Sequence, residues 1–348
     1  MSEFRVVTAA EVEPSRLDEF LCGAYGPTKG EFLRRYGAWW HCGDENRLVV
    51  VRGDEIAGYC AVIPTRCRID GETHPAVWWV DLIVLPEFRG RGLQHLLDER
   101  LRAWGDLKLG FPNPLAARLH LRHGWGVRED FRTLLLPIRP RGARIVRSAH
   151  GTKGALLQLG AVVLSPAAYL LRRRLSRYQP SSARAVESPD PQALAAIFER
   201  HGPRTVATTH RDAAFIRWRY LDAPYRAELT FYVGGPAGDP TLALISRSMG
   251  SPSGTIVRVL DLFGDLDDRA GLRDIVLLAL GDAARYGAIQ VSVLAALPRL
   301  RSFFRALGFL FGSKARFCWH SHSHDLLQRL QQKDCHFSYA DSDNDAAD

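Results

Sequence analysis

Apolar residues follow two different periods along the chain, and these periods predict its elements. A run rich in β-branched and aromatic residues, such as 79–85, indicates a buried strand, whereas the leucine spacing from 93 to 101 indicates a helix. Within the first 137 residues we expect strands at 4–8, 47–52, 55–64, 79–85, 107–111 and 127–136, and helices at 14–25, 28–40, 93–104 and 114–123. This mixture of elements predicts an α/β (α+β) fold.

The same order of elements recurs in the second half. The sequence VRVLDLF at 257–263 repeats WWVDLI at 78–83, and the aromatic helix at 213–221 repeats the one at 31–40. The copy is completed by strands at 229–233, 241–246 and 288–294, a helix at 272–286 and the segment 301–309. We therefore expect two tandem domains, each a mixed, mostly antiparallel sheet flanked by helices. The predicted limits are 1–137 for the first domain, 138–191 for a basic and apolar helical linker, 192–335 for the second domain and 336–348 for an acidic tail.

Composition narrows the class of protein. With 348 residues, of which 46% are hydrophobic, the chain can bury two ordinary cores. Its six cysteines show no Cys-x-x-Cys spacing and its N-terminus lacks the apolar run of a signal peptide, so we expect free thiols and a cytoplasmic protein. The net charge of +8 favours anionic partners such as a nucleotide, a nucleic acid or an acidic membrane surface, without choosing among them.

A basic, glycine-rich turn separates the strand at 79–85 from the helix at 93–104. It contains Arg89, Gly90, Arg91 and Gly92. A helix N-terminus offers unpaired N–H donors and the positive end of a dipole, and glycines let an anion approach the backbone closely. The pattern predicts a binding site for a pyrophosphate; the alternative is a solvated basic turn.

These residues resemble the acetyl-CoA-binding segment of the GNAT superfamily of acyl-CoA-dependent N-acyltransferases. The family pattern is Arg or Gln, two residues, Gly, one residue, then Gly or Ala, which places Arg89 first and Gly92 second. Gln94 departs from the last position. The resemblance continues through GFPNPLAARLHLRHGW at 110–125 and covers residues 4–137.

The resemblance implies a co-substrate, acetyl-CoA or another acyl-CoA, and no metal. It implies that CoA is held by the end of the central strand, by the turn and by an asparagine. These residues are Leu82, Ile83, Val84, Arg89, Gly90, Arg91, Gly92, Leu93, Gln94 and Asn113. Asn113 precedes Pro114, so it can equally be the N-cap of a helix.

The resemblance also implies the reaction, transfer of an acyl group, expected to be acetyl, to the amine of a small molecule or a peptide. At the position where many GNAT proteins carry a tyrosine that protonates the departing thiolate, this chain has His120, and its second half has Phe304. Histidine can transfer a proton near neutral pH, whereas phenylalanine cannot. Asp81 could act as a base, but Asp261 occupies the same place in the second half, which favours a structural role for both.

The second half differs most from the first at the turn. There Asp265, Asp267 and Asp268 stand where the first half has its basic turn, and their carboxylates would repel a pyrophosphate. We therefore expect CoA to bind only the first half.

Other classes of function stay open. The chain could be a non-catalytic acyl-CoA sensor or a membrane-surface scaffold, or a Fem-like aminoacyltransferase that uses aminoacyl-tRNA. The intact CoA turn argues against the last, so a nucleic-acid partner is not expected. Within 139–177, arginines flank the apolar stretch 154–171, which could contact an anionic membrane or pack between the domains. The oligomeric state is left open.

Two weaker patterns complete the sequence. His320, His322 and His324 alternate and could chelate a metal from one strand face, although a loosely ordered surface run is favoured. Residues 340–348 are small and acidic and are expected to be solvated.

Overall fold

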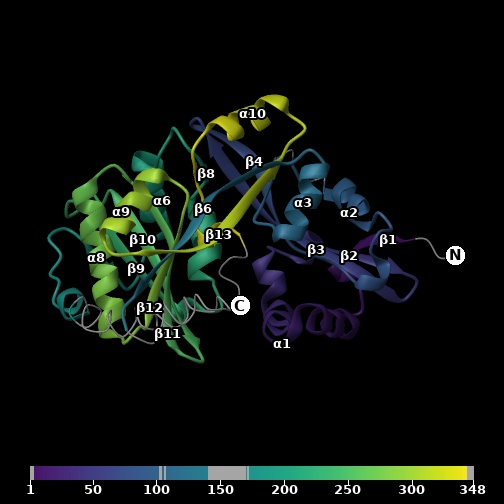
Figure 1. The fold of residues 1–348 in the computed structure, drawn as a ribbon, viewed down its shortest axis with the longest axis horizontal. Helices are drawn as coiled ribbons and strands as arrows, with labels where there is room; N and C mark the ends of the chain where they lie inside the picture. The colour runs from purple at the N-terminus through teal and green to yellow at the C-terminus, as the bar shows by residue number, and fades with distance from the viewer. Residues whose placement is uncertain (1–3, 102–103, 106, 140–169, 171, 343–348) are drawn as a thin grey trace, which may run out of the picture.

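The computed structural model describes residues 4–101, 104–105, 107–139, 170 and 172–342. Within this part of the chain, fourteen strands form one twisted sheet that runs through both halves of the molecule (Figure 1). The strand order is β1-β2-β3-β4-β5-β13-β6-β12-β11-β10-β9-β7, and β8 joins β3 to β14 beside this path. Antiparallel pairs predominate, and the predicted α/β (α+β) fold with a mixed, mostly antiparallel sheet flanked by helices is confirmed.

The first half supplies six strands and three helices. The strands are β1 (Arg5–Thr8), β2 (Arg47–Arg52), β3 (Glu55–Ile69), β4 (Glu72–Val84), β5 (Leu107–Gly110) and β6 (Gly126–Pro137). The helices are α1 (Pro14–Trp40), α2 (Leu93–Leu101) and α3 (Pro114–Arg122). Figure 1 shows α1 on one face of this half of the sheet and α2 and α3 on the other.

The second half repeats the plan with additions. Its strands are β7 (Arg184–Val186), β8 (Ala207–Thr209), β9 (Leu229–Gly234), β10 (Leu242–Ser251), β11 (Gly254–Gly264), β12 (Gln290–Ala295), β13 (Leu310–His320) and β14 (Cys335–His336). Its helices are α6 (Pro191–His201), α7 (Ala213–Ile216), α8 (Arg269–Arg285), α9 (Pro298–Ala306) and α10 (His324–Gln332). A π-turn, Arg217–Leu221, continues α7.

The two halves exchange their last long strands. β13 of the second half lies between β5 and β6 of the first, and β6 in turn pairs with β12 of the second. Apolar residues of β13 therefore join the first core, where Phe317 packs with Trp78 and Phe131, while Leu134 and Leu136 of β6 enter the second core. The sheet thus continues across the predicted boundary at residue 137, and neither half closes its own sheet.

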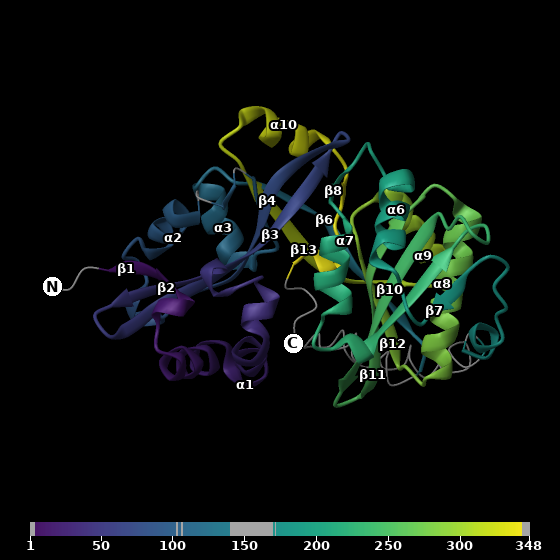
Figure 2. The same ribbon diagram turned by 180° about the vertical axis from the view of Figure 1, so that it is seen from behind.

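Equivalent tryptophans join the two halves on the helical side. The indole of Trp39, at the end of α1, donates to the carbonyl oxygen of Trp218 at 3.3 Å, and the indole of Trp218 donates to that of Trp39 at 2.9 Å. Both lie in the aromatic helices that the sequence pairs as copies. The reciprocal contact gives the molecule an approximate twofold relation at this point, where α1 and α7 face one another (Figure 2).

Helix α1 contains the two helices predicted at 14–25 and 28–40. Gly26 has a φ of 77° and is followed by Pro27, so the backbone bends there. Because Pro27 removes a donor and Gly26 alone tolerates this φ without strain, the sequence enforces the kink locally. The bend directs Tyr25 and Lys29 toward the end of β4, where both line a pocket.

One expectation about the C-terminus is corrected, and the end of the predicted linker packs on the second half. Three backbone amides at 181–183 donate to the Asp274 carboxylate, and β7 pairs with β9. The predicted solvated tail does not begin at Ala340, because Ala340, Asp341 and Ser342 are buried. Burial of this segment follows from the ion pair that Asp341 makes with Arg211, a partner distant in sequence.

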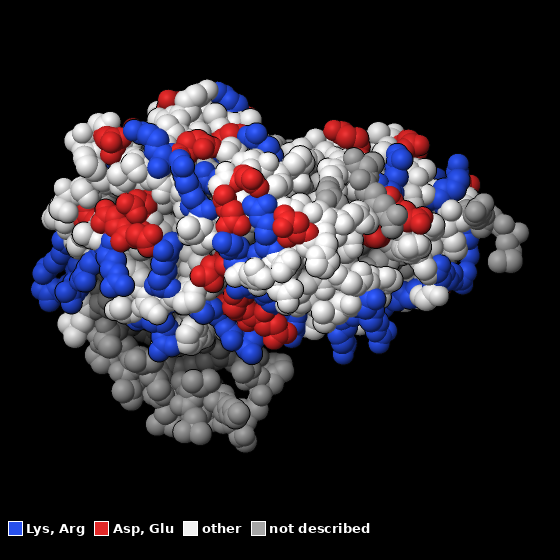
Figure 3. Space-filling model, turned by 90° about the horizontal axis from the view of Figure 1, so that it is seen from above, with Lys and Arg blue, Asp and Glu red and all other residues white. Residues whose placement is uncertain are grey.

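No helix in the described residues is both long and apolar enough to cross a membrane. The apolar stretch predicted at 154–171 falls almost entirely outside those residues. Of its arginine flank, Arg173, Arg174 and Arg177 are exposed. In Figure 3 basic side chains gather at the end of the molecule formed by the second half, whereas acidic and basic groups are mixed elsewhere on that face.

Candidate active site

The glycine turn follows the end of β4 and leads into α2. Gly90 and Gly92 have φ angles of 77° and 75°, which side-chain-bearing residues adopt only with strain. In the part of the chain that the structure describes, no side chain accepts a hydrogen bond from the amides of residues 90–94. The first turn of α2 therefore presents uncapped donors and the positive end of its dipole, as an anion site requires.

A pocket of about 590 Å³ lies between this turn and helix α3. Arg118 and Arg122, one turn apart on α3, form its second wall, and no carboxylate lines it. The complete lining is Val84, Phe88, Arg89, Gly90, Gly92, Leu93, Gln94, His95, Leu115, Arg118, Leu119, Arg122 and His123. The pocket is thus cationic on two sides and suits a ligand with several phosphates.

A second pocket, also of about 590 Å³, continues the first along β4. The two share Val84, Arg89, Gln94, Leu115 and Leu119, so together they form one groove. The second pocket is lined by the end of β4, by α3 and by three residues of α1 and β13. Those three are Tyr25, Lys29 and Cys318.

His120 lies in the wall of this groove, on the buried side of α3. Its ring is 6% exposed and packs against Trp125 at 4.3 Å and Trp79 at 5.3 Å between ring centroids. Burial lowers the pKa of His120 to about 4, and the nearby Asp98 only partly offsets this effect. The imidazole is therefore neutral at neutral pH, and its Nδ1 has no hydrogen-bond partner among the described residues.

Asp81 also lines the groove and lies in a β-bulge of β4. Its carboxylate is buried and contacts Lys29 Nζ at 2.6 Å and His41 Nε2 at 2.9 Å. Burial alone would raise the pKa of Asp81, but Lys29 and His41 outweigh it and hold that pKa below its usual range. A carboxylate so strongly held as an anion is a weak base.

The structure brings most of the predicted CoA-binding residues to the groove. Leu82, Ile83, Val84, Arg89, Gly90, Gly92, Leu93, Gln94 and Asn113 line one or both pockets. Arg91 does not; its guanidinium lies 5.8 Å from the ring centroid of Phe88. Asn113 also caps α3, because its side-chain oxygen accepts from Leu115 and Ala116 at 3.0 and 2.9 Å.

Strand exchange adds a residue of the second half to the site. Cys318 of β13 pairs with Gly110 of β5, and Cys318 lines the groove. A Cβ at Gly110 would already lie 3.4 Å from this sulfur. Cys318 therefore closes one wall of a pocket that otherwise belongs to the first half.

At the corresponding turn of the second half, aspartate side chains accept hydrogen bonds from the backbone amides. Asp265 Oδ1 accepts from the amides of Asp267 and Asp268 at 3.1 and 3.2 Å, and Asp268 caps α8 by accepting from Ala270 and Gly271. The donors that stay uncapped in the first half are thus satisfied by the protein in the second. This adds a physical reason to the charge repulsion expected from the sequence.

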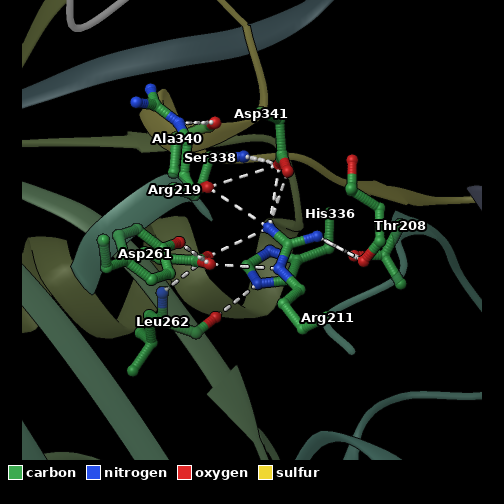
Figure 4. Close-up of polar contacts among 11 residues, drawn as sticks. Thr208, Arg211, Arg219, Asp261, Leu262, His336, Ser338, Ala340 and Asp341 are labelled. Atoms are coloured by element: carbon green, nitrogen blue, oxygen red, sulfur yellow. Dashed lines mark hydrogen bonds and ion pairs between the residues drawn. The ribbon is translucent and has the colours of Figure 1, made fainter. Parts of the chain in front are cut away.

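The bulge of the second half is also filled by the chain itself (Figure 4). Arg211 donates to both oxygens of Asp261 at 3.0 Å and to Asp341 at 2.9 Å, and all three side chains are fully buried. His336 Nε2 donates to the carbonyl oxygen of Leu262 at 2.7 Å. The segment from Cys335 to Ser342 therefore packs against the place that matches the groove of the first half.

The alternating histidines do not share one strand face. His320 ends β13, and His324 begins α10 after Ser323 caps that helix. His320 is half-buried against Trp125, with ring centroids 5.5 Å apart, so the run is not loosely ordered as favoured from the sequence. In the described residues, no group of three or more His, Cys, Asp or Glu side chains is placed to hold a metal.

Several residues of the site were missed from the sequence. Tyr25, Lys29 and His41 surround Asp81, and Arg118 and Arg122 line the phosphate pocket, but none belongs to a recognisable motif. The arginines follow a helical spacing of four, which was a usable signal. The contacts of Asp81 had none, because they depend on how α1 folds back onto β4.

The strand, glycine turn and helix form an arrangement typical of anion sites, with a groove beside it. Residues 15–125 match the family "Acetyltransferase (GNAT) family", so this segment of the chain contains a GNAT acetyltransferase domain. The resemblance to the GNAT superfamily is thereby confirmed. No curated protein matches the sequence.

Solved structures share the fold over both halves. A GCN5-related N-acetyltransferase from Anabaena variabilis is 16% identical, with a TM-score of 0.59 over 91% of this chain and 72% of that one. The N-myristoyltransferase of Saccharomyces cerevisiae with bound myristoyl-CoA is 13% identical, with a TM-score of 0.62 over 92% and 79%. A probable N-acyltransferase from Enterococcus faecalis is 9% identical, with a TM-score of 0.61 over 95% and 75%. At these identities the likeness concerns the fold alone.

Proposed function

We propose that the protein transfers an acyl group, most simply acetyl, from acyl-CoA to the amine of a small molecule or a peptide. The observation that carries this proposal is the single groove that leads from the uncapped glycine turn to the bulge at Asp81 and to His120. The pyrophosphate of CoA would meet the amides of the turn, and the pantetheine arm would follow β4 from Val84 to Leu82. The match to an acetyltransferase family supports acetyl as the group.

In this reaction the amine nitrogen forms a bond to the thioester carbon, the carbon–sulfur bond breaks, and one proton passes from nitrogen to sulfur. A backbone amide at the bulge would stabilise the charge that develops on the carbonyl oxygen. Neutral His120 retains one ring N–H, which can donate to the departing sulfur, and one free nitrogen, which can accept the amine proton. Placing both reactants in one groove supplies much of the remaining acceleration.

Release of free CoA thiol tests the proposal. The purified protein is incubated with acetyl-CoA and a library of amines that ranges from polyamines and amino sugars to peptides. The released thiol is measured with a chromogenic thiol reagent. An amine that raises thiol release well above hydrolysis supports the proposal and identifies the acceptor. A series of acyl-CoA esters with longer chains then defines the acyl group.

Calorimetry with CoA separates the remaining classes. Tight binding of CoA without amine-dependent thiol release would indicate an acyl-CoA sensor. Absence of CoA binding would refute the proposal and return attention to an aminoacyl-tRNA donor.

A further inference from the structure

Both halves place an aspartate in or next to a β-bulge, but only one of these residues has a strained backbone. The register of β4 against β3 shifts between Tyr59 and Ala61, and Asp81 lies in that bulge. The register of β11 against β10 shifts between Ile245 and Ser246, where Leu260 is the extra residue and Asp261, next to it, pairs with Ile245. Asp81 has a φ of 55°, whereas Asp261 is not among the described residues with positive φ. Such strain persists only where surrounding contacts enforce it, and it concentrates at functional sites.

Asp261, which lacks the positive φ of Asp81, makes a hydrogen bond that has no counterpart at Asp81 among the described residues. Asp261 Oδ1 accepts a hydrogen bond from the amide of the next residue, Leu262, at 3.0 Å. The Leu262 amide, which follows the bulge of the second half, is therefore capped by its own neighbour. An amide that is capped in this way cannot stabilise charge on a ligand.

In the first half the carboxylate is drawn elsewhere. Lys29 Nζ contacts Asp81 Oδ1 at 2.6 Å, His41 Nε2 donates to Oδ2 at 2.9 Å, and Tyr25 donates from its hydroxyl to the Asp81 carbonyl oxygen. No side chain in the described residues accepts from the amide of Leu82, the counterpart of Leu262. Leu82 and Lys29 both line the groove.

We propose that Lys29 is a positioning residue that, with Tyr25 and His41, holds the Asp81 carboxylate away from the Leu82 amide. That amide is then available to the thioester carbonyl oxygen of the acyl donor. The inference rests on the proposed function and deepens it. It explains why an aspartate is present in both copies although only one copy keeps the groove, because its effect depends on what pairs with it.

Without Lys29, the Asp81 carboxylate is no longer drawn toward the cation of α1 and can turn to the Leu82 amide. Asp261 shows that a carboxylate at this place can accept from the following amide, which it does while Arg211 also holds it. Loss of one such donor typically lowers kcat by on the order of a hundredfold to a thousandfold. We expect Lys29→Met to lower kcat by about a hundredfold while the Kd for CoA changes by less than about threefold, since the glycine turn is unaltered. Lys29→Arg should recover part of the loss. Arg35→Met, which removes an exposed charge from the same helix, is the matched control.

A second substitution separates positioning from direct participation. In Lys29→Met/Asp81→Gly the carboxylate that caps the amide is gone and glycine adopts the positive φ freely, so kcat should rise at least tenfold above that of Lys29→Met. The double variant also removes the whole buried ion pair, so it should fold better than the single variant. If kcat stays low in the double variant, Lys29 itself acts on the reactants and the proposal is wrong. Full activity of Lys29→Met would also overturn it.

A spectroscopic measurement that needs no turnover can test the positioning role of Lys29 separately from the proposed function. The carbonyl stretch of acetyl-CoA labelled with ¹³C at the carbonyl should lie at lower frequency when bound to the wild type than when bound to Lys29→Met. If wild type binds acetyl-CoA and polarises the carbonyl but releases no thiol with any amine, the proposed function fails and the positioning role stands. Equal frequencies in the two proteins refute the positioning role.

Discussion

His120 offers the sharpest test of how the proton moves. Its pKa of about 4 means that at pH 7 about one molecule in a thousand carries the imidazolium form. If catalysis needed this cation, its contribution would fall about tenfold for each pH unit above 4. If the neutral ring acts, its contribution is constant through the neutral range and is lost only below about pH 5.

The perturbation is His120→Phe, the residue that the second half already has at Phe304. A group that transfers a proton contributes on the order of a hundredfold to ten-thousandfold to the rate. We expect kcat to fall by that order with CoA affinity nearly unchanged, because the ring touches the wall of the groove and not the glycine turn. His324→Phe, on the exposed start of α10, is the control.

The assay is the ratio of wild-type to His120→Phe kcat at half-unit steps from pH 5.5 to 8.5. Taking the ratio removes the titration of the acceptor amine, which both proteins share. We expect a constant ratio. A decline of about a hundredfold between pH 5.5 and 7.5 would show that the cation is the active form and refute the neutral-ring mechanism. A ratio near one at every pH would remove His120 from the chemistry.

The titration itself can be observed by imidazole NMR. The His120 signal is identified by its absence in His120→Phe, and it should titrate near pH 4, well below the value of about 6.5 of an unperturbed imidazole. A midpoint close to 6.5 would contradict the conclusion that burial between Trp79 and Trp125 lowers the pKa of His120.

Three further predictions follow from the two copies and the linker. Gly92→Asp should abolish CoA binding measured by calorimetry, because it places a carboxylate among the uncapped amides; Gly238→Asp, also at positive φ but in an open turn, should not. Arg211→Met should lower the free energy of unfolding by about 3–5 kcal/mol, since it leaves two buried carboxylates without their cation. Their pKa values would then exceed those of the unfolded chain, so the loss should be smaller at pH 5 than at pH 8 by chemical denaturation; an equal loss at both would contradict this account. If the linker contacts a membrane, the wild-type protein should sediment with anionic liposomes at low salt, and the substitutions Arg172→Glu, Arg173→Glu and Arg174→Glu together should prevent this. A wild-type protein that stays in the supernatant would disprove the contact.

Much of the site could be predicted from the sequence because its phosphate end is local. β4, which ends at Val84, the two glycines and the helix from Leu93 follow one another in the chain, and the proposed binding groups are backbone amides. The similar order of elements in the two halves could be predicted for the same reason, since each element repeats its own pattern of apolar residues. His120 and Asp81 were identified through the resemblance to the GNAT superfamily and the comparison with Phe304 and Asp261.

What these residues do was decided only by tertiary structure. The pKa of His120 depends on burial between two tryptophans, and the state of Asp81 depends on Lys29 and His41 from α1. The exchange of β13 and β6 and the burial of Asp341 against Arg211 depend on pairing between segments far apart in the chain. Apolar periodicity reports which face of an element is buried, but not which element covers it. The protonation state of a buried side chain, and whether a backbone amide is capped, depend on short-range contacts with that covering element.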